Sequence, residues 1–222
     1  EIGNPDKFKE YLNLAGHSGL TVTAPSINLS ERTFTVKDNK IIYGLEGIKN
    51  VGSVPASQII EEREKNGGYS SFIDFVTRQP VALGSKVLES LIKCGCFDSL
   101  NEKRATLLFN LKDVIKWDKK RRNTTVNDQM LLFESEKPSF DLIETDEMSF
   151  CEKLQLEKEL LGYYISGHPT DIYREDIDKC VSVDLSDPST WRLGVKTALV
   201  VEVTSARTLY AKKTGKPFTA FT

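Results

Sequence analysis

The chain has 222 residues, of which 39% are hydrophobic and 28% are charged, and its formal net charge is −2. This composition is that of an ordinary globular protein of one large or two small domains, and it excludes a globally basic nucleic-acid binder. The apolar runs are far shorter than a membrane span and no charged-then-apolar leader opens the chain, so we expect a cytoplasmic protein with no membrane partner.

The cysteines and histidines do not form a metal-binding pattern. No two cysteines form a Cys-x-x-Cys pair, and neither histidine is near a cysteine in the sequence. Zinc ligands normally come in such closely spaced pairs, so we predict no metal site and reduced cysteine thiols. The residues concerned are Cys94, Cys96, Cys151, Cys180, His17 and His168.

The N-terminal residues predict one helix followed by a small β element. Asn4 and Pro5 supply an N-cap and a first-turn proline, and the apolar face that follows ends at Gly16 and Gly19. Alternating segments at 20–24, 34–36 and 41–43 predict strands. Asp38 and Asn39 lie between the last two segments and predict a hairpin turn.

Helical spacing dominates from residue 44 to about residue 120. Four helices are predicted here, of which the first ends at Gly67, the third at Gly95 and the last near Lys120. Each begins at a serine, of which the first, Ser53, can cap the free N–H groups of the helix that follows. Ser71 and Ser99 open capping boxes with Asp74 and Glu102 three residues later, and Ser85 starts the third helix.

Residues 121–149 are predicted to be a polar linker with one apolar island, Gln129–Phe133. The chain carries an excess of five positive charges over residues 102–122 and of six negative charges over residues 134–159. Large apolar side chains in a linker need a cover, so the island predicts a docking peptide for a partner protein. The alternative is that Leu132 and Phe133 fold back onto the chain's own core.

Beyond the linker, a helix at 150–165 and a β-rich end are predicted. His168 follows this helix in a Gly-His-Pro sequence, has no obvious partner acid, and predicts a turn rather than a catalytic site. Strands at 197–203 and from Phe218 are joined by a basic turn at 207–216. The turn combines Tyr210 with cations, as strand-contacting loops of oligonucleotide-binding barrels do, and a hairpin made soluble by lysines is an equal alternative to single-stranded DNA binding. The cations are Arg207, Lys212, Lys213 and Lys216.

The run GIKNVG at residues 47–52 carries the main functional prediction. Its glycines permit a tight turn, the helix after it presents free N–H groups, and its lysine adds a positive charge. These features predict a grip on the phosphates of duplex DNA that does not read bases. An ordinary tight connection between two helices is the alternative. The predicted contacts are Gly47, Lys49, Asn50, Gly52 and Ser53.

A looser second hairpin and the basic helix after it extend this predicted surface. Two hairpins side by side would reach both strands of one duplex, and the helix would add phosphate contacts. The residues predicted to bind DNA here are Gly95, Lys119, Lys120, Arg121 and Arg122.

Three motifs in a fixed order resemble one protein family. GLEGIKNVG at 44–52 is similar to the first hairpin of a tandem helix-hairpin-helix domain. LIKCGCFDSL at 91–100 and LEKELLGYYISGHP at 156–169 resemble the C-terminal half of bacterial DNA polymerase III alpha subunits. In that family a peptide of Gln-x-x-Leu-Phe type between these blocks binds the sliding clamp. That position holds Gln129, Met130, Leu131, Leu132 and Phe133 in this chain.

The resemblance implies a fold that is mainly α with small β elements (α+β). A tandem helix-hairpin-helix domain would be flanked by a short N-terminal β element and an incomplete OB-type β region. The implied divisions are 1–43 for the end of the fingers, 44–120 for the tandem domain, 121–149 for the linker, 150–180 for a connecting helix and turn, and 181–222 for the start of the OB-fold.

The resemblance also implies the partners and the limits of the chain's chemistry. The partners would be duplex DNA, the sliding clamp, single-stranded DNA and other replicase subunits. The family's catalytic carboxylates, which hold two Mg²⁺ ions, lie upstream of residue 1. We therefore predict no catalytic residue, metal or cofactor in this chain, and no polymerisation by the chain alone.

Two other functions are consistent with parts of the pattern. A helix-hairpin-helix repair enzyme, such as a glycosylase or nuclease, would need a catalytic acid or lysine beside the hairpin, for which Asp74 and Lys86 are candidates only by proximity. A protein-interaction scaffold with no DNA role would need neither.

Overall fold

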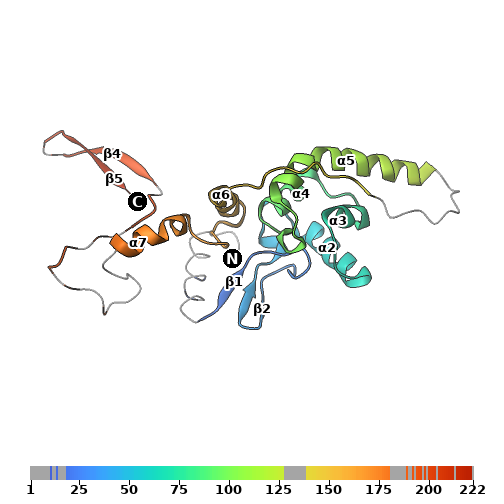
Figure 1. The fold of residues 1–222 in the computed structure, drawn as a ribbon, viewed down its shortest axis with the longest axis horizontal. Coiled ribbons are helices and arrows are strands. Elements are labelled where there is room, and N and C mark those ends of the chain that lie inside the picture. Colours follow the sequence, from blue (N-terminus) through green and yellow to red (C-terminus); the bar gives the residue numbers. More distant parts are fainter. Residues whose placement is uncertain are drawn as a thin grey trace. The chain divides into compact units, whose positions relative to one another are not determined.

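The computed structural model describes residues 11, 14, 19–127, 139–180, 189, 192, 194–196, 198, 200–203, 205–212 and 214–221. The chain forms two compact units, residues 1–166 and residues 167–222. Helices dominate the described residues and the strands form two small sheets, which confirms the predicted mainly α class (Figure 1). None of the described helices is long and apolar enough to cross a membrane.

The first sheet confirms the predicted β element. It consists of β1 (Thr21–Thr23), β2 (Thr35–Lys37) and β3 (Lys40–Ile42) in the order β1-β3-β2. β3 pairs in parallel with β1 and antiparallel with β2. Asp38 and Asn39 make the β2–β3 turn at φ 51° and 58°, a conformation that these two residue types tolerate. The helix predicted to open at Asn4 lies mostly outside the described residues.

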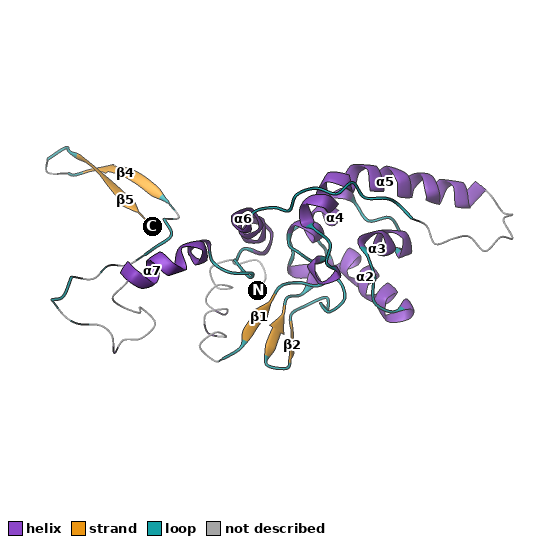
Figure 2. Ribbon diagram, in the orientation of Figure 1, coloured by secondary structure: helices purple, strands orange, loops and turns teal. Residues whose placement is uncertain are grey.

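The helical core follows, as Figure 2 shows by its colours. Its elements are η1 (Leu45–Gly47), α2 (Ser53–Asn66), α3 (Phe72–Arg78), α4 (Ser85–Lys93), η2 (Asp98–Leu100) and α5 (Arg104–Asn127). Phe72, Phe75 and Phe97 are fully buried at its centre, and Phe97 meets each of the other two rings edge-on at 5.1 Å between centroids. Such edge contacts add to the free energy gained by burying the rings.

Two of the predicted helix starts are wrong. The N-cap of α2 is Gly52 rather than Ser53, and no side chain caps it. The longer helix begins at Arg104 rather than after Ser99, because Asn101 adopts a left-handed conformation at φ 60°. Glu102 does not cap this helix; its carboxylate accepts a hydrogen bond from the N–H of Phe72 at 2.8 Å.

The predicted linker is structured at both of its ends. α5 continues to Asn127, past the predicted end at Lys120. Residues 139–148, which we call the strap, run back along α5 towards α6 (Phe150–Leu161) (Figure 1). α6 begins with a capping box between Ser149 and Glu152 and ends at Gly162 in the left-handed conformation.

The second unit contains η3 (Pro169–Tyr173), α7 (Arg174–Cys180), β4 (Ala206–Tyr210) and β5 (Pro217–Phe221). β4 and β5 pair as an antiparallel hairpin. The strand predicted at 197–203 is wrong for residues 198 and 200–203, which have no regular structure. His168 caps the start of η3, accepting from the N–H of Thr170, as expected of a turn residue.

Candidate nucleic-acid interface

The first hairpin, residues 48–52, is anchored by two buried side chains and exposes the residues between them to solvent. Ile48 and Val51 are 2% and 3% exposed, and the N–H of Val51 donates to the carbonyl of Ile48 at 3.0 Å. Between them Lys49 and Asn50 are exposed, and Asn50 turns the chain at φ 71°. Because Ile48 and Val51 are both buried, the two residues between them turn towards solvent.

The start of α2 is open to an anion. Gly52 is extended and exposed, and a Cβ atom placed on it would meet no atom within 4 Å. In the described part of the chain, the N–H groups of Ser53 and Val54 donate to no acceptor. The next residue, Pro55, has no N–H group. Free N–H groups at the positive end of a helix are a ready site for phosphate.

Three contacts fasten this hairpin to its neighbours. The Tyr43 hydroxyl lies 3.2 Å from the carbonyl of Gly47 and 3.1 Å from that of Leu161. The N–H of Lys49 donates to the carbonyl of Leu160 at 3.0 Å, and the Asn50 side chain donates to Ser90 at 3.0 Å. Burial raises the pKa of the Tyr43 phenol, helped by the nearby Cys94, so it stays a donor.

Gly47 is needed for packing rather than for contact with phosphate. A Cβ atom there would lie 2.9 Å from the ring of Tyr43 and 3.3 Å from the ring of Phe34. A larger residue would push these two rings away from the hairpin. Gly47 therefore supports the first hairpin by allowing close packing, whereas Gly52 lies at the exposed end of the hairpin.

The second hairpin, predicted at Gly95, has no free N–H group at Gly95 that a phosphate could reach. Gly95 is buried, and its N–H donates to the carbonyl of Ile92 at 3.0 Å. The guanidinium of Arg104 packs directly against it, which explains why only glycine fits. The prediction that Gly95 contacts phosphate is therefore wrong, because its amide is already used.

The second open helix start is instead at α4, which sequence reasoning missed. Gly84 is an extended N-cap without a side-chain partner, and Ser85 and Lys86 after it are exposed. In the described residues, the N–H groups of Ser85 and Lys86 donate to no acceptor. The signal in the sequence was a glycine followed by a serine at a helix start, as in Gly52-Ser53 at the first hairpin.

Arg104 joins the second hairpin to α6 through a buried ion pair with Glu157 and a second pair with the exposed Asp98. Its guanidinium donates to Asp98 at 2.7 Å, to the carbonyl of Lys93 at 3.0 Å and to Glu157 at 3.0 Å. Glu157 is 0% exposed and also accepts from both the N–H and the hydroxyl of Ser166. The sequence carried a signal for this network, since Glu157 lies at core spacing between Leu154 and Leu160.

The basic helix α5 divides its cations between two roles. Arg121 and Arg122 both bind the buried carboxylate of Asp118, at 2.7 and 2.6 Å. Their guanidinium groups also donate to the carbonyls of Thr77 and Val76 at the end of α3. These two arginines fasten α5 to α3, so the DNA contact predicted for them would compete with these bonds.

Four lysines on α5 stay at the surface and form what we call the lysine row. Lys116 follows Lys112 by four residues, and Lys119 and Lys120 follow Lys116 by three and four, so all of them share one face of the helix. Lys116 forms an exposed ion pair with Asp113 at 3.1 Å, and an exposed pair of this kind contributes little to stability. The row consists of Lys112, Lys116, Lys119 and Lys120, all exposed.

The strap follows α5 through side-chain contacts. The Asn110 amide bonds both the carbonyl and the N–H of Ile143, at 2.9 and 3.0 Å. Trp117 packs edge-on against Phe140 at 5.6 Å. The predicted docking peptide, Gln129–Phe133, lies outside the described residues, between the end of α5 and the strap.

Glu147 of the strap caps α5, and we expect its contribution to depend on pH. It accepts from the N–H groups of Arg104 and Ala105 at 3.2 and 3.1 Å. Burial acts to raise its pKa, but bonds from Met148, Ala105 and Lys153 lower it overall. A lowered pKa means that the stabilisation is present at neutral pH and is lost as the pH falls through the folded-state value.

Glu147→Gln should therefore reduce the free energy of unfolding at pH 7 by about 1 kcal/mol, the usual value of a helix cap. The difference from the parent chain should shrink as the pH is lowered towards 3, where both carry a neutral group. Thermal unfolding of the two proteins across this pH range measures it. A constant difference at all pH values would contradict the cap.

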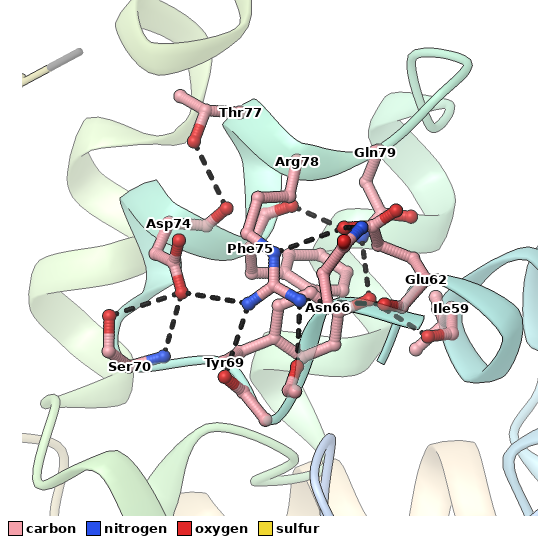
Figure 3. Close-up of polar contacts among 12 residues, drawn as sticks. Ile59, Glu62, Asn66, Tyr69, Ser70, Asp74, Phe75, Thr77, Arg78 and Gln79 are labelled. Carbon is pink, nitrogen blue, oxygen red and sulfur yellow. Dashed lines mark hydrogen bonds and ion pairs between the residues drawn. The ribbon is translucent and has the colours of Figure 1, made fainter. Parts of the chain in front are cut away.

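The acid considered for a repair enzyme is held in a structural network (Figure 3). The Asp74 carboxylate accepts from the N–H and hydroxyl of Ser70 and pairs with Arg78 at 3.3 Å. Arg78 also bonds Glu62 and lies 4.6 Å from the ring centre of Tyr69. Asp74 thus stabilises the α2–α3 connection, and no group of acidic, cysteine or histidine residues in the described chain could hold a metal ion.

The cations predicted in the turn of the C-terminal hairpin do not all lie in that turn. Arg207 lies within β4, opposite Ala220, rather than in the turn. Lys212 and Lys216 are exposed beside the turn, and Tyr210 is 70% exposed. Lys213 lies outside the described residues.

Comparison with known proteins agrees with this geometry. A family model described as a helix-hairpin-helix motif matches residues 19–107. The chain is 44% identical over 192 residues to the DNA polymerase III subunit alpha of Borreliella burgdorferi, covering 83% of this chain and 17% of that protein. The same subunit of Treponema pallidum is 38% identical over 221 residues, 97% of this chain and 19% of that protein.

A more distant relative gives the same result. The DNA polymerase III subunit alpha of Bacillus subtilis is 36% identical over 181 residues, which cover 79% of this chain and 16% of that protein. The chain spans less than a fifth of the length of these relatives. The family resemblance drawn from the motifs is confirmed.

Proposed function

We propose, from the premise that this chain is homologous to a segment of bacterial DNA polymerase III alpha subunits, that it is the DNA-handling segment of a replicative polymerase. It holds the backbone of duplex DNA without reading sequence, and it ties the enzyme to the sliding clamp. The whole protein would copy DNA in the cytoplasm with Mg²⁺ at carboxylates outside this chain.

The open start of α2 is the observation that carries this proposal. Exposed N–H groups at Ser53 and Val54, with Lys49 beside them, suit a phosphate oxygen and no particular base. The start of α4 at Ser85 repeats the arrangement, and the lysine row adds charge along a third element. We accordingly assign the duplex contacts to these three places and not to Gly95, Arg121 or Arg122.

Clamp binding and single-stranded DNA binding are the finer parts of the proposal. Gln129 would fix the register of the peptide by hydrogen bonding, and Leu132 and Phe133 would fill an apolar pocket of the clamp. A tethered polymerase rebinds the primer end before it diffuses away, because the tether raises its effective concentration. The β4–β5 hairpin, with Tyr210 and its lysines, would be the start of an OB-fold that contacts single strands.

A proline substitution tests the backbone grip directly. Ser53→Pro removes one N–H donor, and its fixed φ suits the first position of a helix whose N-cap is already extended. Loss of a hydrogen bond to a charged group should weaken binding to a paired duplex about tenfold. Fluorescence anisotropy with a labelled duplex of arbitrary sequence measures this.

Ser53→Ala is the matched control, since it removes the hydroxyl and keeps the N–H. We expect it to bind within about twofold of the parent chain. Binding of the parent should also fall steeply with salt and be the same for different sequences. Equal affinities of Ser53→Pro and Ser53→Ala, or no binding at low salt, would refute the grip and favour a scaffold without a DNA role.

A further inference from the structure

A cavity of about 580 Å³ lies between the first hairpin and the end of α6. Its apolar lining includes Phe34, Ile48, Leu160 and Leu161, and the hairpin backbone at 47–52 forms one wall. This volume is within the range of pockets that enclose a small organic group. The duplex grip proposed above uses only the rim of this cavity and leaves its interior without a role.

The contacts that fasten the hairpin also hold the cavity in shape. The Tyr43 hydroxyl lies within hydrogen-bond distance of carbonyls on both walls, those of Gly47 and Leu161. The bond from Lys49 to the carbonyl of Leu160 joins the same two walls. A ligand would therefore meet a preformed site and would not have to separate packed elements.

The rim of the cavity has hydrogen-bond donors on one side and a hydrogen-bond acceptor on the other. Lys49 and Gly52 line the side that adjoins the free N–H groups of α2. Glu159 lines the α6 side, is exposed, and forms no hydrogen bond or ion pair in the described residues, whereas Glu46 pairs with Arg32 at 3.5 Å. The cavity thus has an apolar interior, with groups that bind an anion on one side and a carboxylate on the other. A nucleotide has matching parts, since it joins a flat ring with amino groups to a phosphate.

We propose that this cavity takes one unpaired nucleotide of the DNA held by the first hairpin. The base lies among the apolar side chains, an amino group of the base donates to Glu159, and the phosphate binds the N–H groups at the start of α2. This inference rests on the proposed function, because the hairpin must first hold the backbone. It adds that the segment prefers duplexes carrying an unpaired base.

Two duplexes of equal length test the proposal with the full chain. One is fully paired, and the other carries a single 2-aminopurine bulge, whose fluorescence reports on the environment of the base. Burial of one base is expected to make the bulged duplex bind about tenfold more tightly, with a change in 2-aminopurine fluorescence. Anisotropy gives both affinities.

Variants of α6 separate the cavity from the grip. Glu159→Trp covers the mouth with a ring and should abolish the preference for the bulged duplex, without weakening binding to the paired one. Gln155→Trp, at an exposed position of α6 that does not line the cavity, should keep the preference. Glu159→Gln should keep most of it, since its carbonyl still accepts a hydrogen bond.

Equal affinity of the parent chain for the two duplexes would overturn the proposal and leave an apolar protein side chain as the candidate occupant. A preference that survives Glu159→Trp would also overturn it, since the bulge would then bind elsewhere. Failure of the parent chain to bind the paired duplex is a different result, which refutes the duplex grip itself.

Discussion

Replacing Glu157 with alanine is expected to lower the free energy of unfolding by about 3 to 5 kcal/mol. The carboxylate is 0% exposed and accepts from the Arg104 guanidinium, from the N–H groups of Ile165 and Ser166, and from the Ser166 hydroxyl. Removing it leaves the buried Arg104 guanidinium without this acceptor, and Arg104 keeps only its bonds to Asp98 and the carbonyl of Lys93. Because the network joins α5 and α6, its loss should loosen both.

Urea unfolding followed by far-ultraviolet circular dichroism measures this loss, since most of the described helices lie in residues 1–166. Glu159→Ala is the matched control: it lies two residues further along α6, is exposed, and should change the free energy by less than about 0.5 kcal/mol. If Glu157→Ala also costs less than about 1 kcal/mol, the buried Arg104–Glu157 pair contributes no net stability, and apolar packing holds α5 and α6 together.

The double variant Leu132→Ala with Phe133→Ala should abolish binding to a bacterial sliding clamp. Buried apolar anchors of a docking peptide carry most of its binding energy, about 2 kcal/mol or more each. Losing two of them should weaken the complex by more than about a hundredfold. Surface plasmon resonance with immobilised clamp measures the affinity of the parent and variant chains.

Two controls distinguish docking from core packing. Glu134→Ala with Ser135→Ala alters the same stretch without touching an apolar residue, and it should bind the clamp almost as the parent does. The thermal transition of the Leu132 and Phe133 variant should match that of the parent chain. Undiminished clamp binding would reject the docking role, and a lowered transition would show that these side chains belong to the core.

Local rules predicted the elements whose signals lie within a few residues of one another. Asp38-Asn39 specified the β2–β3 turn, Ser71 specified the start of α3, and Gly67 specified the end of α2. In each case one residue type satisfies or relieves the backbone at that point, whatever lies around it. The first hairpin belongs to the same class, since Ile48 and Val51 are buried and the residues between them are exposed.

Local rules failed where a distant partner decided the outcome. Glu102 had the spacing of a cap for the next helix, but the N–H of Phe72 takes its carboxylate instead. Arg121 and Arg122 belonged to a basic run, and only the folded chain brings the carbonyls of Thr77 and Val76 to them. These pairings join residues more than 25 positions apart in the sequence, beyond the reach of any spacing rule.

The sequence by itself determined the family, the mainly helical class and the turn of the first hairpin, because these depend on ordered motifs and on local backbone chemistry. Only the tertiary structure decided which cations face solvent and which glycine offers its amide. Gly95 lies under Arg104 and Gly52 lies in the open, although each is a glycine in a turn between two helical segments. The physical reason is that exposure depends on what packs above a residue, and that is settled by contacts between distant segments.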